Sequence, residues 1–177
     1  MTESLRITRG QGSVTISINR PEVGNTITDD MLVLLAEHVT EAGKDERVNA
    51  VVLTSEGDTF CHGRERGPAP GGPPRNAHDA HQRVFRRILD VYAAFQACPV
   101  PVVASVRGKA LGFGCALVAG ADVAIATRSA RFALPEMLHG TPPTLAMSAA
   151  SKVARKTLAD LVSVSYTHLT LPTNLCV

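Results

Sequence analysis

The fold is decided between Pro101 and Cys115, where the sequence reads PVVASVRGKALGFGC. Its first part, residues 102–106, is apolar and too short for a helix, so it predicts a buried strand. The three glycines within residues 108–114 then predict a turn, and the apolar residues 115–119 predict a short helix. Because glycine permits close backbone approach, a turn of this kind can present main-chain N–H groups to a ligand.

Short strands and helices alternate along the rest of the chain. Residues 5–8 and 13–18 alternate apolar and polar side chains around a glycine turn, which predicts a hairpin. Further extended segments are expected over 49–54, 122–127 and 131–133, and helices over 28–43, 77–97, 143–153 and 155–162. Two of these helices have clear core stripes: Met31, Leu34, Leu35 and Val39 in the first, and Val84, Ile88, Val91, Ala94 and Phe95 in the second.

Composition narrows the class of protein. A length of 177 residues suits one layered α/β domain, and 45% hydrophobic residues are enough for a buried core. A formal net charge of +2 gives no field that would favour nucleic acid as a partner. The four cysteines have no paired spacing, no basic and apolar leader begins the chain, and glycines break its apolar runs. These features predict a reduced, cytoplasmic protein that does not enter a membrane.

A second glycine turn follows the predicted strand 49–54 and reads Phe60-Cys61-His62-Gly63-Arg64. The main-chain N–H groups of this turn and of the turn at 112–114 could converge on one oxygen atom. Such a pair of donors forms an oxyanion hole, which stabilises an enolate or a tetrahedral thioester intermediate. Residues 63–74 hold four prolines and four glycines, and predict a mobile surface loop beside this turn.

Four segments spread over residues 5–162 resemble, in order and spacing, the signatures of the enoyl-CoA hydratase/isomerase (crotonase) superfamily. They are Asn19-Arg20-Pro21-Glu22 with Asn25, Phe60-Cys61-x-Gly63, the stretch 101–115 already quoted, and Phe132-x-Leu134-Pro135-Glu136. The resemblance implies an α/β fold with a crotonase-like ββα spiral core. It also implies an acyl-CoA thioester as substrate, with coenzyme A present only as part of that substrate and no permanently bound cofactor.

The resemblance also assigns roles to residues. It implies that the backbone N–H groups of Arg64 and Phe113 form the oxyanion hole, and that Glu136 is the acid/base. Both oxyanion positions are usually small in the family, so these two side chains are expected to reshape the acyl pocket. The implied contacts to substrate and coenzyme A are Glu22, Val23, Asn25, His62, Gly63, Glu65, Arg66, Gly112, Ala116 and Pro135.

One departure from the family pattern bears on the reaction. Hydratases that resemble this chain use two glutamates, and the first of them falls at Ala116, whose methyl group cannot transfer a proton. Three interpretations stay open. Glu136 can act alone, as in double-bond isomerases; Glu65 can supply a second carboxylate; or the chain is a catalytically inactive subunit that binds coenzyme A or a protein partner.

Other candidate sites have simpler explanations. His78 and His81 share a helix face but lack a third ligand, so no metal site is expected. Cys61 and Cys115 are expected to be packing residues, and Asp122 to satisfy backbone donors at a turn. No Gly-x-Ser-x-Gly elbow supports a hydrolase.

The end of the chain differs from the rest. Residues 164–173, VSYTHLTLPT, lack helical periodicity and read like translated adaptor DNA from a sequencing library; a natural disordered tail is the alternative. The expected division is therefore an incomplete core over 1–162 and a non-native tail over 163–177. The resemblance implies further C-terminal helices that would build a homotrimer or a dimer of trimers, so exposed apolar faces and low solubility are expected.

Overall fold

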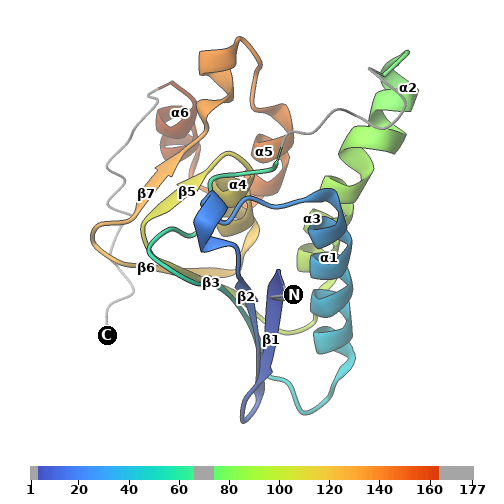
Figure 1. Ribbon diagram of the computed structural model, residues 1–177, viewed down its shortest axis with the longest axis vertical. Coiled ribbons are helices and arrows are strands. Elements are labelled where there is room, and N and C mark those ends of the chain that lie inside the picture. Colours follow the sequence, from blue (N-terminus) through green and yellow to red (C-terminus); the bar gives the residue numbers. More distant parts are fainter. Residues whose placement is uncertain (1–3, 66–73, 164–177) are drawn as a thin grey trace.

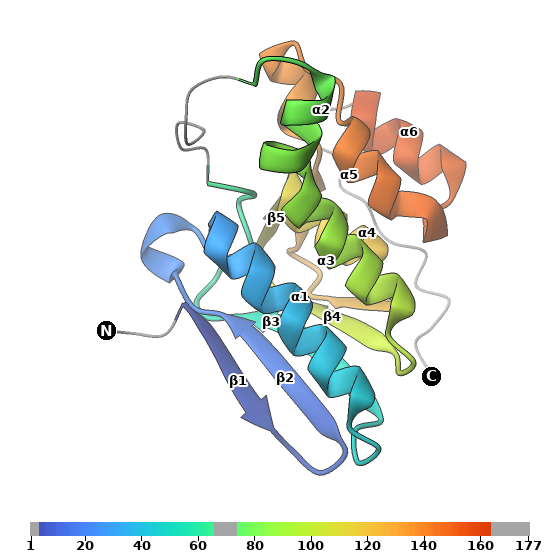
Figure 2. The same cartoon turned by 90° about the vertical axis from the view of Figure 1, so that its right-hand side faces the viewer.

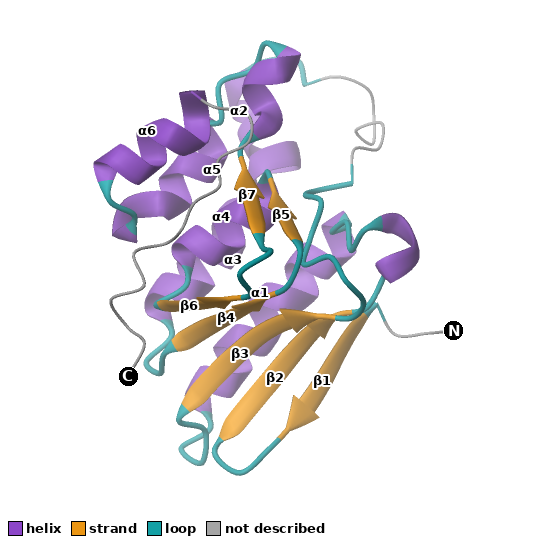
Figure 3. Cartoon of the chain, turned by 90° about the vertical axis from the view of Figure 1, so that its left-hand side faces the viewer, coloured by secondary structure: helices purple, strands orange, loops and turns teal. Residues whose placement is uncertain are grey.

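The computed structural model describes residues 4–65 and 74–163. Its main sheet has five strands in the order β1-β2-β3-β4-β6, and Figure 3 shows these strands next to one another. The first two strands are antiparallel and the others are parallel. The strands are β1 (Leu5–Arg9), β2 (Ser13–Ile18), β3 (Ala50–Ser55), β4 (Val102–Val106) and β6 (Val123–Ala126). The predicted hairpin and strands are confirmed, with ends that differ by at most one residue.

Two long helices, α1 (Asp29–Lys44) and α3 (Arg86–Ala97), lie side by side across one face of this sheet (Figure 2). The core between helices and sheet includes Ile16, Leu53 and Val91, all fully buried. Helix α3 continues α2 (Ala77–Ala80) through a π-helical segment, His81–Phe85. The predicted helix 77–97 is therefore confirmed as an almost continuous helical rod.

The core stripe of α1 differs in one position from the expectation. Thr28 is the N-cap as predicted, and its side chain accepts a hydrogen bond from the backbone N–H of Met31 (3.3 Å). Met31, Leu35 and Val39 are buried, but Leu34 is 42% exposed, and Leu32 is buried in its place. At about 100° per residue, Leu34 lies about 100° around the helix from Leu35, whereas Leu32 lies only about 60° away. The prediction for Leu34 was wrong for this geometric reason.

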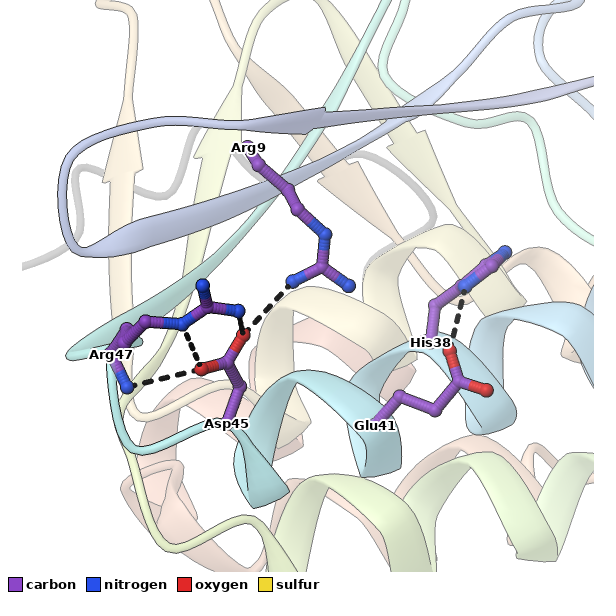
Figure 4. Close-up of polar contacts among 5 residues, drawn as sticks. All are labelled: Arg9, His38, Glu41, Asp45 and Arg47. Carbon is purple, nitrogen blue, oxygen red and sulfur yellow. Dashed lines mark hydrogen bonds and ion pairs between the residues drawn. The ribbon is translucent and has the colours of Figure 1, made fainter.

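The C-terminal end of α1 is tied to β1 by surface charges (Figure 4). The carboxylate of Asp45 accepts hydrogen bonds from the Arg47 guanidinium (2.9 Å) and from Arg9 (3.3 Å). The hydrogen bonds from Arg47 hold the pKa of Asp45 at about 2. One turn earlier, His38 faces Glu41 (3.7 Å). These contacts lie at the opposite end of α1 from the candidate site.

A second, two-stranded sheet stands at a steep angle to the first (Figure 3). It pairs β5 (Lys109–Leu111) with β7 (Arg131–Ala133) in parallel, and α4 (Phe113–Gly120) follows β5 directly. The sequence predicted only a turn over 108–114, so β5 is a correction. The strand forms because Ala110 pairs with Cys61 on one side and Phe132 on the other. Both partners are distant in sequence.

The described chain ends in Pro135–His139, a short 3-10 turn, followed by α5 (Thr144–Ala149), a second turn at Ala150–Lys152, and α6 (Arg155–Ser163). Figure 1 shows α5 beside α4 and α6 near β7, both away from β1. The proposed tail lies outside the described residues except for Ser163, and the domain division stays a prediction. In the described ranges, no helix combines the length and apolar character needed to cross a bilayer.

Candidate active site

A cavity of about 470 Å³ opens where the ends of several elements meet. It is bounded by the loop after β3, the start of α4, the rod that contains α3, and residues 135–146. The sequence-predicted residues that line it are His62, Gly63, Arg64, Gly112, Phe113, Pro135 and Glu136. Segments more than 70 residues apart in the sequence therefore converge here, as the family resemblance led us to expect.

The first backbone donor comes from the loop after β3. Ile27 donates its N–H to the carbonyl of Gly63 (2.9 Å) and accepts from the N–H of Glu65 (2.8 Å). In such a parallel bridge the residue between these two turns its own N–H to the opposite side. The N–H of Arg64 is thus directed away from Ile27 and has no partner among the described residues.

The second donor is the first residue of α4. The first hydrogen bond inside this helix runs from the N–H of Ala116 to the carbonyl of Gly112 (3.0 Å). The N–H of Phe113 therefore has no intrahelical acceptor, and it lies at the positive end of the helix dipole. Gly112 has a φ of 52°, a left-handed conformation that favours glycine. Gly112 and Phe113 both line the cavity.

Two glycines bring the donors together. Gly63 has a φ of 111°, and a Cβ built on it would lie 3.8 Å from the backbone nitrogen of Phe113. Gly114 contacts the other side of the same loop, where an added Cβ would overlap the carbonyl oxygen of Cys61. The loop after β3 and the start of α4 therefore approach each other closely because neither glycine has a side chain.

Glu136 faces the same point. Its Oε1 would lie 3.2 Å from a Cβ built on Gly112, next to the second donor. Its Oε2 is fully enclosed and has no hydrogen-bond partner in the described structure. An enclosed carboxylate oxygen without a partner costs free energy, and such groups are concentrated at functional sites. The arrangement suits a general base, which would accept a proton from a bound ligand.

The side chains of Arg64 and Glu65 point elsewhere. The guanidinium of Arg64 donates to Oδ1 of Asp29 through both Nε (3.0 Å) and Nη2 (2.7 Å), at the start of α1. Arg87 contacts the other oxygen of Asp29 (3.1 Å). The carboxylate of Glu65 accepts from Arg20 (2.7 Å) and does not line the cavity. These ion pairs support the loop rather than supply a second carboxylate.

Of the other residues predicted to contact substrate or coenzyme A, some line the cavity and others do not. His62 is exposed beside Gly24 and lines the cavity. Glu22 and Val23 are exposed on a surface turn that does not line it. Ala116 is only 2% exposed, within α4, and does not line the cavity either. Arg66 lies outside the described residues.

Asn25 is the most constrained of the predicted contacts. It is fully buried, and its φ of 55° is left-handed. Its side-chain nitrogen donates to the carbonyls of Glu56 (2.8 Å) and Thr59 (2.6 Å), while its side-chain oxygen accepts from the N–H of Arg20 (2.9 Å). The Asn25 side chain therefore joins two loops near the site and is not available to a ligand.

Replacement of Asn25 by alanine is expected to lower the free energy of unfolding by about 3 kcal/mol, because buried carbonyls lose donors and alanine resists a left-handed backbone. The measurement is urea denaturation. Asn25→Gly is the matched control: it keeps the backbone conformation, so it should recover about 1 kcal/mol of the loss. An alanine variant as stable as the parent protein would contradict this account.

The two buried cysteines are packing residues in this geometry. Burial raises the pKa of Cys61 to about 12. Burial and, next, the charge of Glu136 raise the pKa of Cys115 to about 12. Thiolate, which is the nucleophilic form, is therefore scarce at both positions near neutral pH. No group of three potential metal ligands occurs in the parts of the chain that the structure describes.

Iodoacetamide at pH 8 is expected to leave Cys61 and Cys115 unmodified in the folded protein, because both thiols are enclosed and protonated. In denaturant both should react, because unfolding removes the burial that raises their pKa values. Peptide mass spectrometry measures the extent at each site. Partly exposed Cys98 is the internal reference, and labelling of Cys115 as fast as Cys98 would refute the packing role.

The structure adds residues that sequence reasoning did not assign to the site. Phe85, Ile88 and Tyr92 line the cavity from the helical rod. Their i, i+3, i+7 spacing places them on one face, but the same spacing describes any core stripe. Only the tertiary structure distinguishes a cavity wall from ordinary packing.

Comparisons with known proteins agree with this geometry. The family profile described as "Enoyl-CoA hydratase/isomerase" matches residues 8–163. The chain is 33% identical over 127 residues to 1,2-epoxyphenylacetyl-CoA isomerase of Escherichia coli, covering 70% of this chain and 47% of the isomerase. It is 30% identical over 162 residues to a rat protein named enoyl-CoA hydratase domain-containing protein 3, mitochondrial, covering 89% of this chain and 52% of the rat protein.

A crystal structure of an enoyl-CoA hydratase from Mycobacterium smegmatis superimposes with a TM-score of 0.80 at 34% identity, covering 93% of this chain and 64% of that chain. The α/β architecture of this chain is thus the architecture of solved relatives. The chain spans about half the length of the sequence relatives it matches. The predicted cytoplasmic location stays a prediction.

Proposed function

Because the chain belongs to the enoyl-CoA hydratase/isomerase (crotonase) superfamily, we propose that its cavity binds an acyl-CoA thioester and stabilises the enolate of that thioester. The thioester oxygen would accept hydrogen bonds from the N–H groups of Arg64 and Phe113. Both donors border the cavity and have no acceptor within the described protein. Donors fixed in advance at a developing negative charge are an effective source of catalysis.

Glu136 is the proposed base. Its carboxylate removes the α-proton of the acyl group, and the electron pair of the C–H bond moves onto the thioester oxygen. A proton is then added to the same carbon or to another carbon of the delocalised enolate. The observation that carries this proposal is the Glu136 carboxylate, whose Oε1 lies next to Gly112 and whose Oε2 has no hydrogen-bond partner in the described structure.

Isomerisation of a double bond fits these residues better than hydration. Hydration needs a second group that holds and activates water, and the position expected for it is Ala116, which is buried in α4. Glu65 is engaged with Arg20 at 2.7 Å and does not line the cavity, so it is not placed to take over that task. Shifting a proton along a carbon chain requires only the enolate site and an acid/base.

The coenzyme A part of the substrate and the assembly belong to the same proposal. His62 and the exposed residues Glu22 and Val23 lie around the loops that would meet coenzyme A, as the family resemblance implies. Arg66 is assigned to the same region on that basis. A homotrimer or a dimer of trimers is the proposed assembly of the whole protein.

The test uses butanoyl-CoA and 3-hexenoyl-CoA with the purified chain in D₂O. We expect deuterium at the α-carbon of butanoyl-CoA and conversion of the 3-enoyl to the 2-enoyl thioester, both followed by NMR. Binding without exchange would instead favour the inactive coenzyme A-binding subunit, the alternative that Ala116 supports. Absence of both binding and exchange would refute the proposal.

A further inference from the structure

Tyr92 is a polar residue of the cavity that has no role in the proposed enolate chemistry of Glu136. It lies on α3 and lines the cavity together with Glu136. Its ring stacks on Phe113, with centroids 6.0 Å apart and planes inclined by 28°. The residue is only 6% exposed. Phe113 thus carries an oxyanion donor on its backbone and positions Tyr92 with its side chain.

The hydroxyl of Tyr92 has no hydrogen-bond partner within the described residues and is not among the fully enclosed polar atoms, so a bound ligand can reach it. Glu136 lines the same cavity, and its enclosed Oε2 also has no partner within the described residues. The wall around them is otherwise largely apolar, with Phe85 and Ile88 on the preceding turns. A ligand bound in this cavity can therefore accept a hydrogen bond from the Tyr92 hydroxyl while it contacts Glu136.

Electrostatics link the two groups. Burial, and next the negative charge of Glu136, raise the pKa of Tyr92 well above its ordinary range. Tyr92 is therefore a neutral hydrogen-bond donor whenever Glu136 is ionised. Cys115, the other titratable group coupled to this pair, is also protonated because burial raises its pKa to about 12. Tyr92 can therefore act as the acid of the site, with Glu136 as the proposed base.

We propose that the Tyr92 hydroxyl is the second proton-transfer group of the site, taking the place left open by Ala116. The proposal rests on the proposed function, and it specifies where the second proton comes from. His62 also lines the cavity, but it is exposed and lies against Gly24, away from the enclosed pair. Tyr92 is buried, so we assign the second proton transfer to Tyr92 and not to His62.

The proposed reaction converts a 3-enoyl thioester into the 2-enoyl thioester. Glu136 takes the α-proton of a 3-enoyl thioester, and the C–H electron pair enters the dienolate. The O–H bond of Tyr92 breaks, its proton forms a new C–H bond at the γ-carbon, and its electron pair stays on the phenolate. The carboxylic acid of Glu136 then protonates the phenolate. The double bond has moved, and both side chains have returned to their starting states.

The decisive experiment follows the fate of a label. The substrate is 3-hexenoyl-CoA deuterated at the α-carbon, in ordinary water, under single-turnover conditions. With Tyr92 as the donor, the γ-carbon of the product receives hydrogen from the tyrosine, not deuterium. In Tyr92→Phe, we expect isomerisation to fall about 100-fold relative to α-exchange, and residual product to carry deuterium at the γ-carbon.

The outcomes separate the two proposals. If the unsubstituted protein shows no Glu136-dependent α-exchange, the proposed function fails, and the Tyr92 step fails with it. If exchange occurs but Tyr92→Phe isomerises at the parent rate, only the Tyr92 step is overturned. Tyr92→Phe keeps the ring that stacks on Phe113, so a packing role alone predicts a fully active phenylalanine variant and a damaged Tyr92→Leu variant.

An NMR measurement tests the pair without turnover. The chain has two tyrosines and no tryptophan, so ¹³Cζ-tyrosine labelling gives two resonances, which Tyr166→Phe assigns. The Tyr92 resonance should shift as Glu136 is protonated on acidification, and this inflection should disappear in Glu136→Gln. A Tyr92 resonance with the same pH profile in both proteins would show that the two groups are too far apart for the relay.

Discussion

Glu136→Gln is expected to lower α-proton exchange and enoyl-CoA isomerisation by about 1000-fold while leaving the protein folded. Glutamine has nearly the same shape as glutamate but cannot accept a proton at the pH of the reaction. The substitution should cost little stability, because Oε2 of Glu136 has no hydrogen bond to lose in the described structure. The readouts are deuterium incorporation into butanoyl-CoA and the midpoint of urea denaturation.

Glu46→Gln is the matched control, because Glu46 is exposed and does not line the cavity. It removes one carboxylate and should change neither readout. Glu65→Gln addresses the remaining carboxylate. Because Glu65 forms an ion pair with Arg20, we expect Glu65→Gln to keep its exchange activity. A loss of exchange activity as large as that of Glu136→Gln would identify Glu65 as a second catalytic group. Full activity of Glu136→Gln would refute the assigned base.

Gly114→Ala is expected to impair stability and activity together. A Cβ at position 114 would overlap the carbonyl oxygen of Cys61 and lie 2.8 Å from the Cβ of Cys61. That carbonyl also accepts a hydrogen bond from Leu111 (2.8 Å), so it cannot move without disturbing β5. Relief of the overlap must separate α4 from the loop after β3, at an expected cost of about 3 kcal/mol in the free energy of unfolding.

The same separation moves the N–H of Arg64 relative to the N–H of Phe113. A displacement of about 1 Å in a catalytic constellation can cost about 100-fold in rate, so exchange per folded molecule should fall by about that factor. The measurements are urea denaturation and butanoyl-CoA exchange under conditions where both proteins are folded.

Gly120→Ala, in the same helix, supplies the control. Its nearest atoms to an added Cβ are 3.7 Å away, so alanine fits there and is expected to stabilise α4 by up to about 1 kcal/mol. Equal stability of Gly114→Ala and the parent would show that the two backbones are not in close contact.

Much of the architecture could be predicted because it depends on local signals. The N-cap at Thr28, the two-residue alternation of β2 and the short apolar runs of β3 and β4 are properties of adjacent residues. Each of these elements therefore appears where the sequence predicts it. The exceptions depend on distant partners: β5 exists because Cys61 and Phe132 pair with it, and Leu34 is exposed because the orientation of α1 on the sheet favours Leu32.

By itself, the sequence determined the α/β class, the order of the elements, the family and the identity of the candidate base, because spaced motifs such as the one ending at Glu136 carry that information. Only the tertiary structure decided what surrounds that base. Burial and side-chain direction arise when remote segments meet. They bring Tyr92 and Glu136 to one cavity, direct the Arg64 side chain to Asp29, and bury Asn25. The spacing of residues along the chain does not carry this information.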